Sequence, residues 1–338
     1  MERLKRNLIL ALALGVAVYL ILGILSGFGD LREALDDFDY ALIPAILGLV
    51  SLSYVGRLFR WLYYLKVIKV SMPLGINSAI FAAGLSMTIS PGKLGEVLKS
   101  VFVRQASGAP IARTAPVVVA ERATDGTGMV AWGLLGSLAF SFGPGILLAF
   151  LAATALGIAV LRSKRLSLLA ERVLSKIPLL DRFAPHLNDF HGASNELLAA
   201  RPLVVGTIIS FLSWGLEILA VYLCAVGMGA QTPFLVVTFI FAVSSIAGSL
   251  SMLPGGIGAA EAGLAGGFVT AGLTVALAVA LTFVIRLVTL WFATLIGVVG
   301  LFVVRGLLGN TPTSPEPRLG AGTRTRVNKG KKGPGGDG

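Results

Sequence analysis

Charged residues are scarce in this chain. Only 13% of its 338 residues are charged, whereas an ordinary soluble domain has about 25%. Hydrophobic residues make up 55% of the sequence, and 42 residues are glycine. This composition excludes an ordinary water-soluble domain. It predicts a membrane protein in which glycines let helices pack closely or break.

Cysteine and histidine are almost missing. The one cysteine, Cys224, excludes a disulfide framework and a thiolate metal site. The two histidines, His186 and His191, have no further ligand residues at metal-binding spacing. The sequence also contains no Ser-His-Asp set and no phosphate-binding loop ending in Lys-Ser or Lys-Thr. We therefore expect no catalytic residues, no metal and no cofactor.

The net charge of +11 comes mainly from residues 1–6, residues 162–182 and the segment after Arg305. Basic clusters beside apolar runs are typical of contact with an anionic membrane surface. We therefore expect membrane lipids as partners and no nucleic acid.

Apolar runs long enough to cross about 30 Å of hydrocarbon predict an all-α polytopic membrane protein. Because the first run has no cleavage motif, we interpret it as a retained span and not a signal peptide. Two other apolar stretches, 76–106 and 231–272, are interrupted by Pro-Gly motifs and predict re-entrant hairpins of two half-helices each. The six predicted full spans are 7–28, 41–65, 113–140, 143–161, 202–226 and 276–304.

The distribution of lysine and arginine predicts the orientation, because positive charge collects in cytoplasmic loops. It places both termini in the cytoplasm of a plasma-membrane protein and lets the two hairpins enter from opposite sides. Residues 162–201 are predicted as a helix lying on the cytoplasmic interface, with a plain connecting loop as the alternative. Residues 311–338 are predicted as a disordered basic cytoplasmic tail.

Residues 1–310 form one predicted transmembrane domain with an internal repeat. Repeat 1 covers about 41–140 and repeat 2 about 202–304. Pro91 and Pro254 are 163 residues apart, and Arg122 and Arg286 are 164 apart. Because the halves run in opposite senses, they predict the inverted-repeat architecture of many secondary transporters.

Charged side chains inside predicted spans are the strongest functional signal. Each costs at least about 2.5 kcal/mol at the centre of a membrane, so such residues usually line a cavity or pathway. Two alternatives stay open: the charges only pair structurally, for instance Glu121 with an arginine of the neighbouring span, or Arg57 and Arg60 reach the lipid headgroups. The residues are Arg57, Arg60, Glu121, Arg122, Asp125, Glu217 and Arg286 in spans, and Lys93, Glu96, Lys99 and Glu261 in or just after the breaks.

The two breaks predict an anion site. Pro91 and Pro254 each suit the first position of a half-helix, whose free amides and positive dipole end point at the break. Neighbouring glycines would let a headgroup approach the backbone, although they also suit plain helix packing. Together with Lys93, Arg122 and Arg286 the breaks would bind a phosphate. The glycines are Gly92, Gly95, Gly255, Gly256 and Gly258.

The ordered set of motifs resembles the flippase-like transmembrane domain of lysylphosphatidylglycerol synthases over roughly residues 5–305. The motifs are Gly56-Arg57-Leu58-Phe59-Arg60-Trp61, Ser90-Pro91-Gly92-Lys93-Leu94-Gly95-Glu96, Glu121-Arg122-Ala123-Thr124-Asp125, Leu253-Pro254-Gly255-Gly256-Ile257-Gly258 with Glu261, and Arg286. The resemblance implies movement of an aminoacylated or glycosylated lipid between leaflets. We expect a free-standing member without an aminoacyl-transfer domain, which works with a lipid-modifying enzyme.

The predicted function is therefore translocation of an anionic lipid, whether aminoacylated, glycosylated or a polyprenyl phosphate. Arg57, Arg60, Arg122 and Arg286 would bind the phosphate, and Glu96, Glu121, Asp125, Glu217 and Glu261 would pair with the arginines in the empty site. Two alternatives are a membrane-embedded enzyme acting on a lipid-linked headgroup and a transporter of a small anion. The sequence leaves the oligomeric state open.

Overall fold

The computed structural model describes residues 17, 24, 28–90, 97–140, 145–165 and 184–309. Every regular element within these residues is a helix, which confirms the all-α fold class. The tail 311–338 and, apart from three residues, the first predicted span 7–28 lie outside the described residues. The same holds for residues 166–183 of the predicted interfacial helix and for Pro91, Gly92, Lys93, Gly95 and Glu96 at the first break.

The described helices follow the predicted spans and hairpins closely, usually to within three residues. They are α2 (Phe28–Asp36), η1 (Tyr40–Leu42), α3 (Ile43–Val67), α4 (Leu74–Leu85), η2 (Ser86–Ile89), α5 (Leu98–Ser107), α6 (Ile111–Ser137), α7 (Gly145–Arg162), α9 (Ala184–Leu197), α10 (Ala200–Gly227), α11 (Phe234–Leu250), η5 (Pro254–Gly256), α12 (Ala259–Thr270), α13 (Val275–Arg286), the π-helical η6 (Leu287–Trp291) and α14 (Phe292–Gly309).

Among the residues that the structure describes, three continuous helical stretches are long and apolar enough to cross a membrane: Tyr40–Val67, Ala200–Gly227 and Val275–Gly309. They match three of the predicted spans. The 27 residues of α6 are also long enough, at about 1.5 Å per residue, although the centre of this helix is charged. The protein is a polytopic helical membrane protein.

Local sequence explains where several helices begin and end. Prolines stand at helix starts, where their missing amide hydrogen is not needed: Pro44 lies in the first turn of α3, and Pro110 precedes α6. Thr274 caps α13 by accepting a hydrogen bond from the amide of Leu277. Gly108 adopts a left-handed conformation and ends α5.

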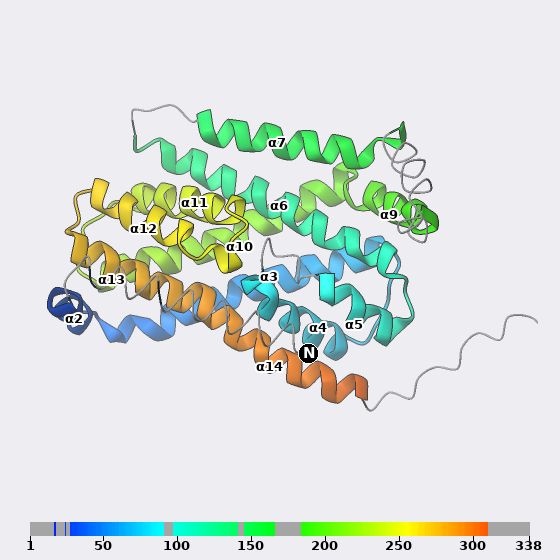
Figure 1. Ribbon diagram of the computed structural model, residues 1–338, viewed down its shortest axis with the longest axis horizontal. Coiled ribbons are helices and arrows are strands. Elements are labelled where there is room, and N and C mark those ends of the chain that lie inside the picture. Colours follow the sequence, from blue (N-terminus) through cyan, green and yellow to red (C-terminus); the bar gives the residue numbers. More distant parts are fainter. Residues whose placement is uncertain are drawn as a thin grey trace, which may run out of the picture.

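Two helical hairpins enter the bundle from opposite ends, with α4 and α5 at one end and α11 and α12 at the other (Figure 1). Their tips meet inside the bundle, where η2 contacts η5. Ile89 of the first tip and Ile257 of the second form a small buried cluster with Leu290 of η6. The hairpin prediction is thus confirmed for the second hairpin and for the described arms of the first.

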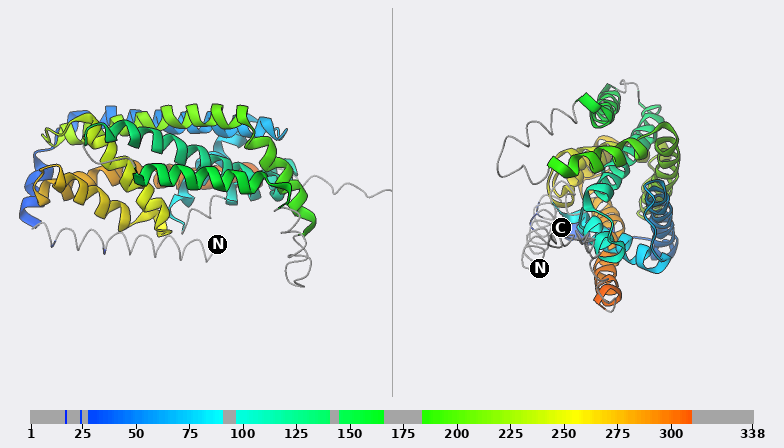
Figure 2. Two further views of the ribbon diagram at one scale, coloured as in Figure 1. Left: turned by 90° about the horizontal axis from the view of Figure 1, so that it is seen from above. Right: turned by 90° about the vertical axis from the view of Figure 1, so that its right-hand side faces the viewer.

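The packing of the two halves is reciprocal. The spans α3 and α10 lie side by side along one flank of the bundle (Figure 2), α14 packs along α4, and α6 packs along α11. Glycine permits both of the latter contacts, because a methyl group on Gly297 would overlap the backbone of Ser86, and one on Gly136 would overlap the backbone of Phe239. The last span of each half therefore packs on the first hairpin arm of the other half.

The predicted interfacial segment 162–201 is only partly described. Its described part contains α9, which packs against α6 and α7. Ala193 and Leu197 of α9 are fully buried there. Arg113 at the start of α6 donates to Glu196 of α9 at 3.3 Å and to the carbonyl of Ile68 at 3.1 Å. Arg113 thus connects the start of α6 to α9 and to the end of α3.

Candidate functional site

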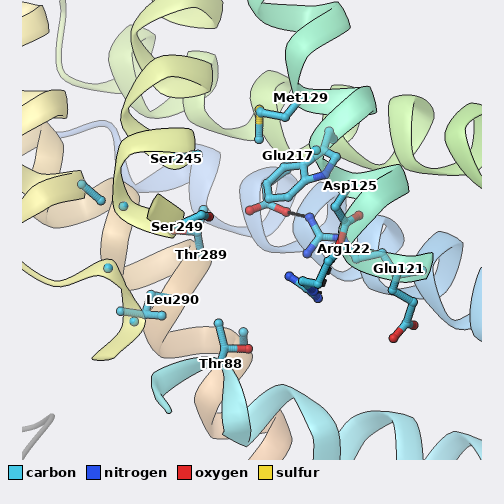
Figure 3. A pocket seen from close by; sticks show the side chains of 18 of the residues that line it. Thr88, Glu121, Arg122, Asp125, Met129, Glu217, Ser245, Ser249, Thr289 and Leu290 are labelled. Carbon is cyan, nitrogen blue, oxygen red and sulfur yellow. Dashed lines mark hydrogen bonds and ion pairs between the residues drawn. The ribbon is translucent and has the colours of Figure 1, made fainter. Parts of the chain in front are cut away.

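A cavity of about 360 Å³ lies at the centre of the bundle. Its walls come from α3, α6, α7, α10, both hairpins and η6. Asp125, near the middle of α6, is one of the residues that line it. Figure 3 shows charged side chains of α6 and α10 on one side of the cavity and the hydroxyl residues of α11 on the other. The cavity therefore lies where the two hairpin tips meet the charged centres of the spans.

The first ion pair in the cavity joins Arg57 of α3 to Glu217 of α10. Ser53, one turn before Arg57, donates to the same carboxylate at 3.4 Å. The guanidinium of Arg57 lies 4.2 Å from the ring centroid of Trp214 and 5.7 Å from that of Tyr54. Aromatic faces stabilise a desolvated cation. The side chain of Arg57 is therefore held in the cavity and does not reach toward the headgroups.

The second ion pair joins Arg60 of α3 to Asp125 of α6 at 2.6 Å. Arg60 is buried and also donates to Ser210 and to Thr124. Arg122, one turn before Asp125, lies 3.5 Å from the other oxygen of this carboxylate. Two arginines thus share one aspartate, and the less buried of them, Arg122, faces the cavity.

The third ion pair joins Lys99 of α5 to Glu121 of α6. The ammonium of Lys99 lies 4.5 Å from the ring centroid of Trp61 and 5.9 Å from that of Phe81. The prediction that Glu121 pairs with an arginine of the neighbouring span is therefore wrong. The buried lysine of the first hairpin occupies that place, and the nearby Arg60 is taken by Asp125.

The fourth ion pair joins Arg286 to Glu261 of α12 at 2.7 Å. Arg286 also donates to the carbonyl of Gly255 at 2.7 Å. The other oxygen of Glu261 accepts from the amide of Gly258, at 2.7 Å, at the start of α12. Arg286 directly precedes the π-helical turn η6, and such turns are frequent at functional sites. The last span is thereby tied to the tip of the second hairpin.

The half-helix of the second hairpin does not begin at Pro254, as the sequence predicted. Pro254 opens only a short 3-10 turn, and α12 begins at Ala259. Gly255, Gly256 and Gly258 all have positive φ angles, so the chain reverses sharply before the helix can start. These glycines form the hairpin tip. The amide of Gly258 is not free for a ligand, because it donates a hydrogen bond to the carboxylate of Glu261.

The cluster carries a formal excess of positive charge among the described residues. Five cations, Arg57, Arg60, Lys99, Arg122 and Arg286, face four carboxylates, Glu121, Asp125, Glu217 and Glu261. The net charge of this set is therefore +1. Such an excess of positive charge among largely buried groups favours the binding of an anion.

The structure brings together Arg57, Arg60, Glu121, Arg122, Asp125, Glu217, Gly255, Gly256, Glu261 and Arg286. Sequence reasoning left out three kinds of site residue: Lys99 as a pairing partner, the aromatic residues Tyr54 and Trp214, and the hydroxyl residues Thr88, Ser245 and Ser249. The four-residue spacing of Ser245 and Ser249, which places both on one helix face, was the available signal. The described residues contain no group of three or more metal-ligating side chains.

Comparison with known proteins agrees with this architecture. A UPF0104 membrane protein of Pyrococcus horikoshii is 24% identical over 324 residues, which cover 88% of this chain and 96% of the relative. A UPF0104 membrane protein of Methanothermobacter thermautotrophicus is 24% identical over 87% of this chain and 92% of its own length. Another from the same organism is 34% identical over 121 residues, 36% of each chain. A family model described as the lysylphosphatidylglycerol synthase TM region matches residues 10–297. The chain belongs to the family of the lysylphosphatidylglycerol synthase transmembrane region.

Proposed function

We propose that this protein moves a lipid with an anionic headgroup from one membrane leaflet to the other. The observation that supports it most is the cluster of four buried ion pairs around a cavity between two opposed hairpin tips, to which Arg122 adds a fifth cation and thus a net charge of +1. In the proposed complex the headgroup phosphate lies between Arg57, Arg60, Arg122 and Arg286.

Unused hydrogen-bond donors support an anionic ligand. The Nε atoms of Arg57 and Arg60 and the indole Nε1 of Trp214 are buried and donate to no acceptor in the described part of the chain. A buried donor without a partner costs about 1 to 3 kcal/mol. A phosphate in the cavity would accept from such donors through its several oxygens.

The lining of the cavity supports a lipid over a small soluble anion. Apolar side chains, among them Phe150, Phe241 and Ile246, share the walls with the charged residues. Leu250 lines the cavity and is also 64% exposed, so the cavity reaches the outer surface of the bundle at the end of α11. This geometry suits a headgroup inside the cavity and hydrocarbon chains that extend into the membrane.

Exchange of ion-pair partners supplies the mechanism. In the empty site each carboxylate neutralises a cation. An arriving phosphate would replace Glu217 at Arg57 and Glu261 at Arg286, and would thereby loosen contacts between spans and between span and hairpin. The reciprocal packing of the halves and the opposed hairpins support an inverted repeat, with repeat 1 at about 41–140 and repeat 2 at about 202–304. Loosening one hairpin while the other stays tied would give access from one side at a time.

Family membership supports a lipid as the substrate. The proposed location is the plasma membrane with both termini cytoplasmic, and a lipid-modifying enzyme would supply the substrate. Basic residues near the helix ends, among them Lys66, Lys69 and Arg305, are consistent with this orientation.

Leaflet exchange in proteoliposomes tests the proposal. Purified protein is reconstituted with tail-labelled fluorescent lipids, and dithionite is used to quench the label in the outer leaflet. We expect exchange of anionic phospholipids, and Arg122→Gln should slow it at least tenfold. Arg32→Gln is the matched control, since the pair of Arg32 with Asp36 on α2 is exposed. Equal exchange by both variants, or none by the parent protein, would contradict the proposal.

The same preparation distinguishes the two alternative functions. Mass spectrometry of the lipids after incubation would reveal a consumed or altered headgroup if the protein were a membrane-embedded enzyme. Uptake of phosphate into the lumen without lipid exchange would instead indicate a transporter of a small anion. Lipid translocation predicts unchanged lipid masses and no phosphate uptake.

A further inference from the structure

The wall of the cavity opposite the ion pairs carries hydroxyl groups. Ser245 and Ser249 lie four residues apart on α11 and share one face of that helix, and Thr88 lies in the tip of the first hairpin. Figure 3 places these residues across the cavity from Glu217, Arg122 and Asp125. The cavity thus has charged side chains of α6 and α10 on one wall and, on the other, these three hydroxyls, which form the hydroxyl wall.

These three hydroxyls have no hydrogen-bond partner within the part of the chain that the structure describes. In an apolar helix a serine or threonine usually donates to the carbonyl three or four residues earlier. Thr238 on α11 donates to Phe234 in this way, and Thr289 donates to Ile285. Ser245, Ser249 and Thr88 therefore keep their donor and acceptor capacity for a ligand.

The carboxylates of the cluster, in contrast, are already paired with cations. Glu121, Asp125, Glu217 and Glu261 each accept from a lysine or arginine. A headgroup that carries an amine would add positive charge to a site that is already cationic. A headgroup with neutral hydroxyls would need only hydrogen-bonding partners, and the opposite wall provides them.

We infer that the transported headgroup is a phosphate esterified to a polyol, such as glycerol, inositol or a single sugar. The phosphate lies against the arginines, and the polyol hydroxyls bind Ser245, Ser249 and Thr88. This inference rests on the proposed function and narrows its substrate. The cavity of about 360 Å³ is near the lower end of the about 300 to 1,000 Å³ found for small-molecule pockets, so it accepts one small polyol and not an oligosaccharide.

A pair of lipids that differ only in hydroxyl groups tests the inference. Phosphatidylglycerol and phosphatidylpropanol have the same charge and the same number of headgroup carbons, but only the former has free hydroxyls. With identical labelled chains, phosphatidylglycerol should exchange about tenfold faster, the effect expected of one or two neutral hydrogen bonds. Phosphatidylinositol and a lysyl-bearing phosphatidylglycerol are tested alongside to distinguish a polyol from an amine.

The variant Thr88→Ala/Ser245→Ala/Ser249→Ala should reduce this ratio to about one, because phosphatidylglycerol then loses the hydrogen bonds that distinguish it from phosphatidylpropanol. Ser244→Ala is the matched control, because Ser244 is buried against Gly263 and lies outside the cavity wall. It should keep the tenfold preference. A ratio of one in the parent protein, or fastest exchange of the lysyl-bearing lipid, would overturn the inference while the proposed translocation stands.

Binding provides a second readout that does not depend on transport. Each lipid is added to purified protein in detergent, and the shift of the thermal unfolding midpoint is measured, since a ligand of the folded state stabilises it. Phosphatidylglycerol should raise the midpoint more than phosphatidylpropanol does in the parent protein and in Ser244→Ala. The two lipids should raise the midpoint equally in the variant that lacks Thr88, Ser245 and Ser249. Equal shifts in the parent protein would overturn the inference, whether or not any lipid exchanges. A complete absence of lipid exchange would contradict the proposed function instead.

Discussion

Arg57 of α3 and Glu217 of α10 form an ion pair between two adjacent spans, and the guanidinium of Arg57 also lies 4.2 Å from the ring centroid of Trp214. Both side chains are largely buried. Removing one partner of a buried pair typically costs about 3 to 5 kcal/mol, because the other charge is then uncompensated. A substrate phosphate that replaces Glu217 would keep Arg57 compensated, since it supplies a new negative charge.

Removing one or the other member of this pair should change the affinity for anionic lipid in opposite directions. Glu217→Gln leaves Arg57 without its carboxylate, so anionic phospholipid should bind about tenfold more tightly but exchange more slowly, because nothing then displaces it. Arg57→Gln should weaken binding about tenfold. Titration of each variant with a labelled anionic lipid in detergent measures the affinity. Weaker binding by Glu217→Gln would show that Glu217 contacts the ligand directly.

Arg286 ties the last span to the tip of the second hairpin through Glu261 and the carbonyl of Gly255. Arg286→Gln should reduce lipid exchange at least tenfold and lower the free energy of unfolding by about 3 kcal/mol. It should also increase amide hydrogen exchange at the hairpin tip, from Leu253 to Gly258. Hydrogen exchange monitored by mass spectrometry checks this. An unchanged tip in the variant would mean that Arg286 does not position the hairpin.

Gly297 lies where α14 meets the backbone of Leu85 and Ser86, at the junction of α4 and η2. Gly297→Val should force the two helices apart and cost about 1 to 3 kcal/mol, as overpacking usually does. Gly306, on the same helix, has open space around it, so Gly306→Ala should be neutral or slightly stabilising. Thermal unfolding of the two variants in detergent provides the comparison. Equal stability would indicate that α14 and α4 do not pack as the structure shows.

The meeting of the hairpin tips rests on Ile89, Ile257 and Leu290. Ile257→Ala removes buried contacts and should destabilise the protein by about 2 to 5 kcal/mol. It should also make the cavity more accessible to water-soluble reagents. Val269→Ala, at a partly exposed position on α12, is the control and should change little. Labelling of a cysteine placed at Thr88 in a Cys224→Ala background measures the access.

The spans and hairpins could be predicted because apolar length and Pro-Gly interruptions determine which segments cross or re-enter a membrane. Most charged site residues could be predicted for a related reason, since Arg57 or Asp125 is too costly to place inside a membrane without a charged partner or a polar cavity. Which charges pair could not be predicted. Glu121 pairs with Lys99 because of how the first hairpin packs against α6, and that packing depends on contacts far apart in the sequence.

The hydroxyl wall could not be predicted from the sequence, for a different reason. A serine in a membrane helix usually has little energetic cost because it donates to its own backbone, so the sequence carries no strong signal that Ser245 does not do so. The start of α12 was predicted five residues early. Proline favours a helix start, but Gly255, Gly256 and Gly258 permit a left-handed turn that residues with a Cβ atom would resist.

Binding of a phosphate charge at the centre of the membrane is the central claim, and neutralising that charge on the lipid tests it most directly. Two labelled lipids with identical chains and headgroups are compared in proteoliposomes, one with an anionic phosphodiester and the other with the phosphate methylated to a neutral triester. We predict that the diester exchanges at least tenfold faster than the triester, and that Arg122→Gln largely removes the difference. Equal exchange of diester and triester by the parent protein would contradict the claim that the arginines of this cavity recognise the phosphate.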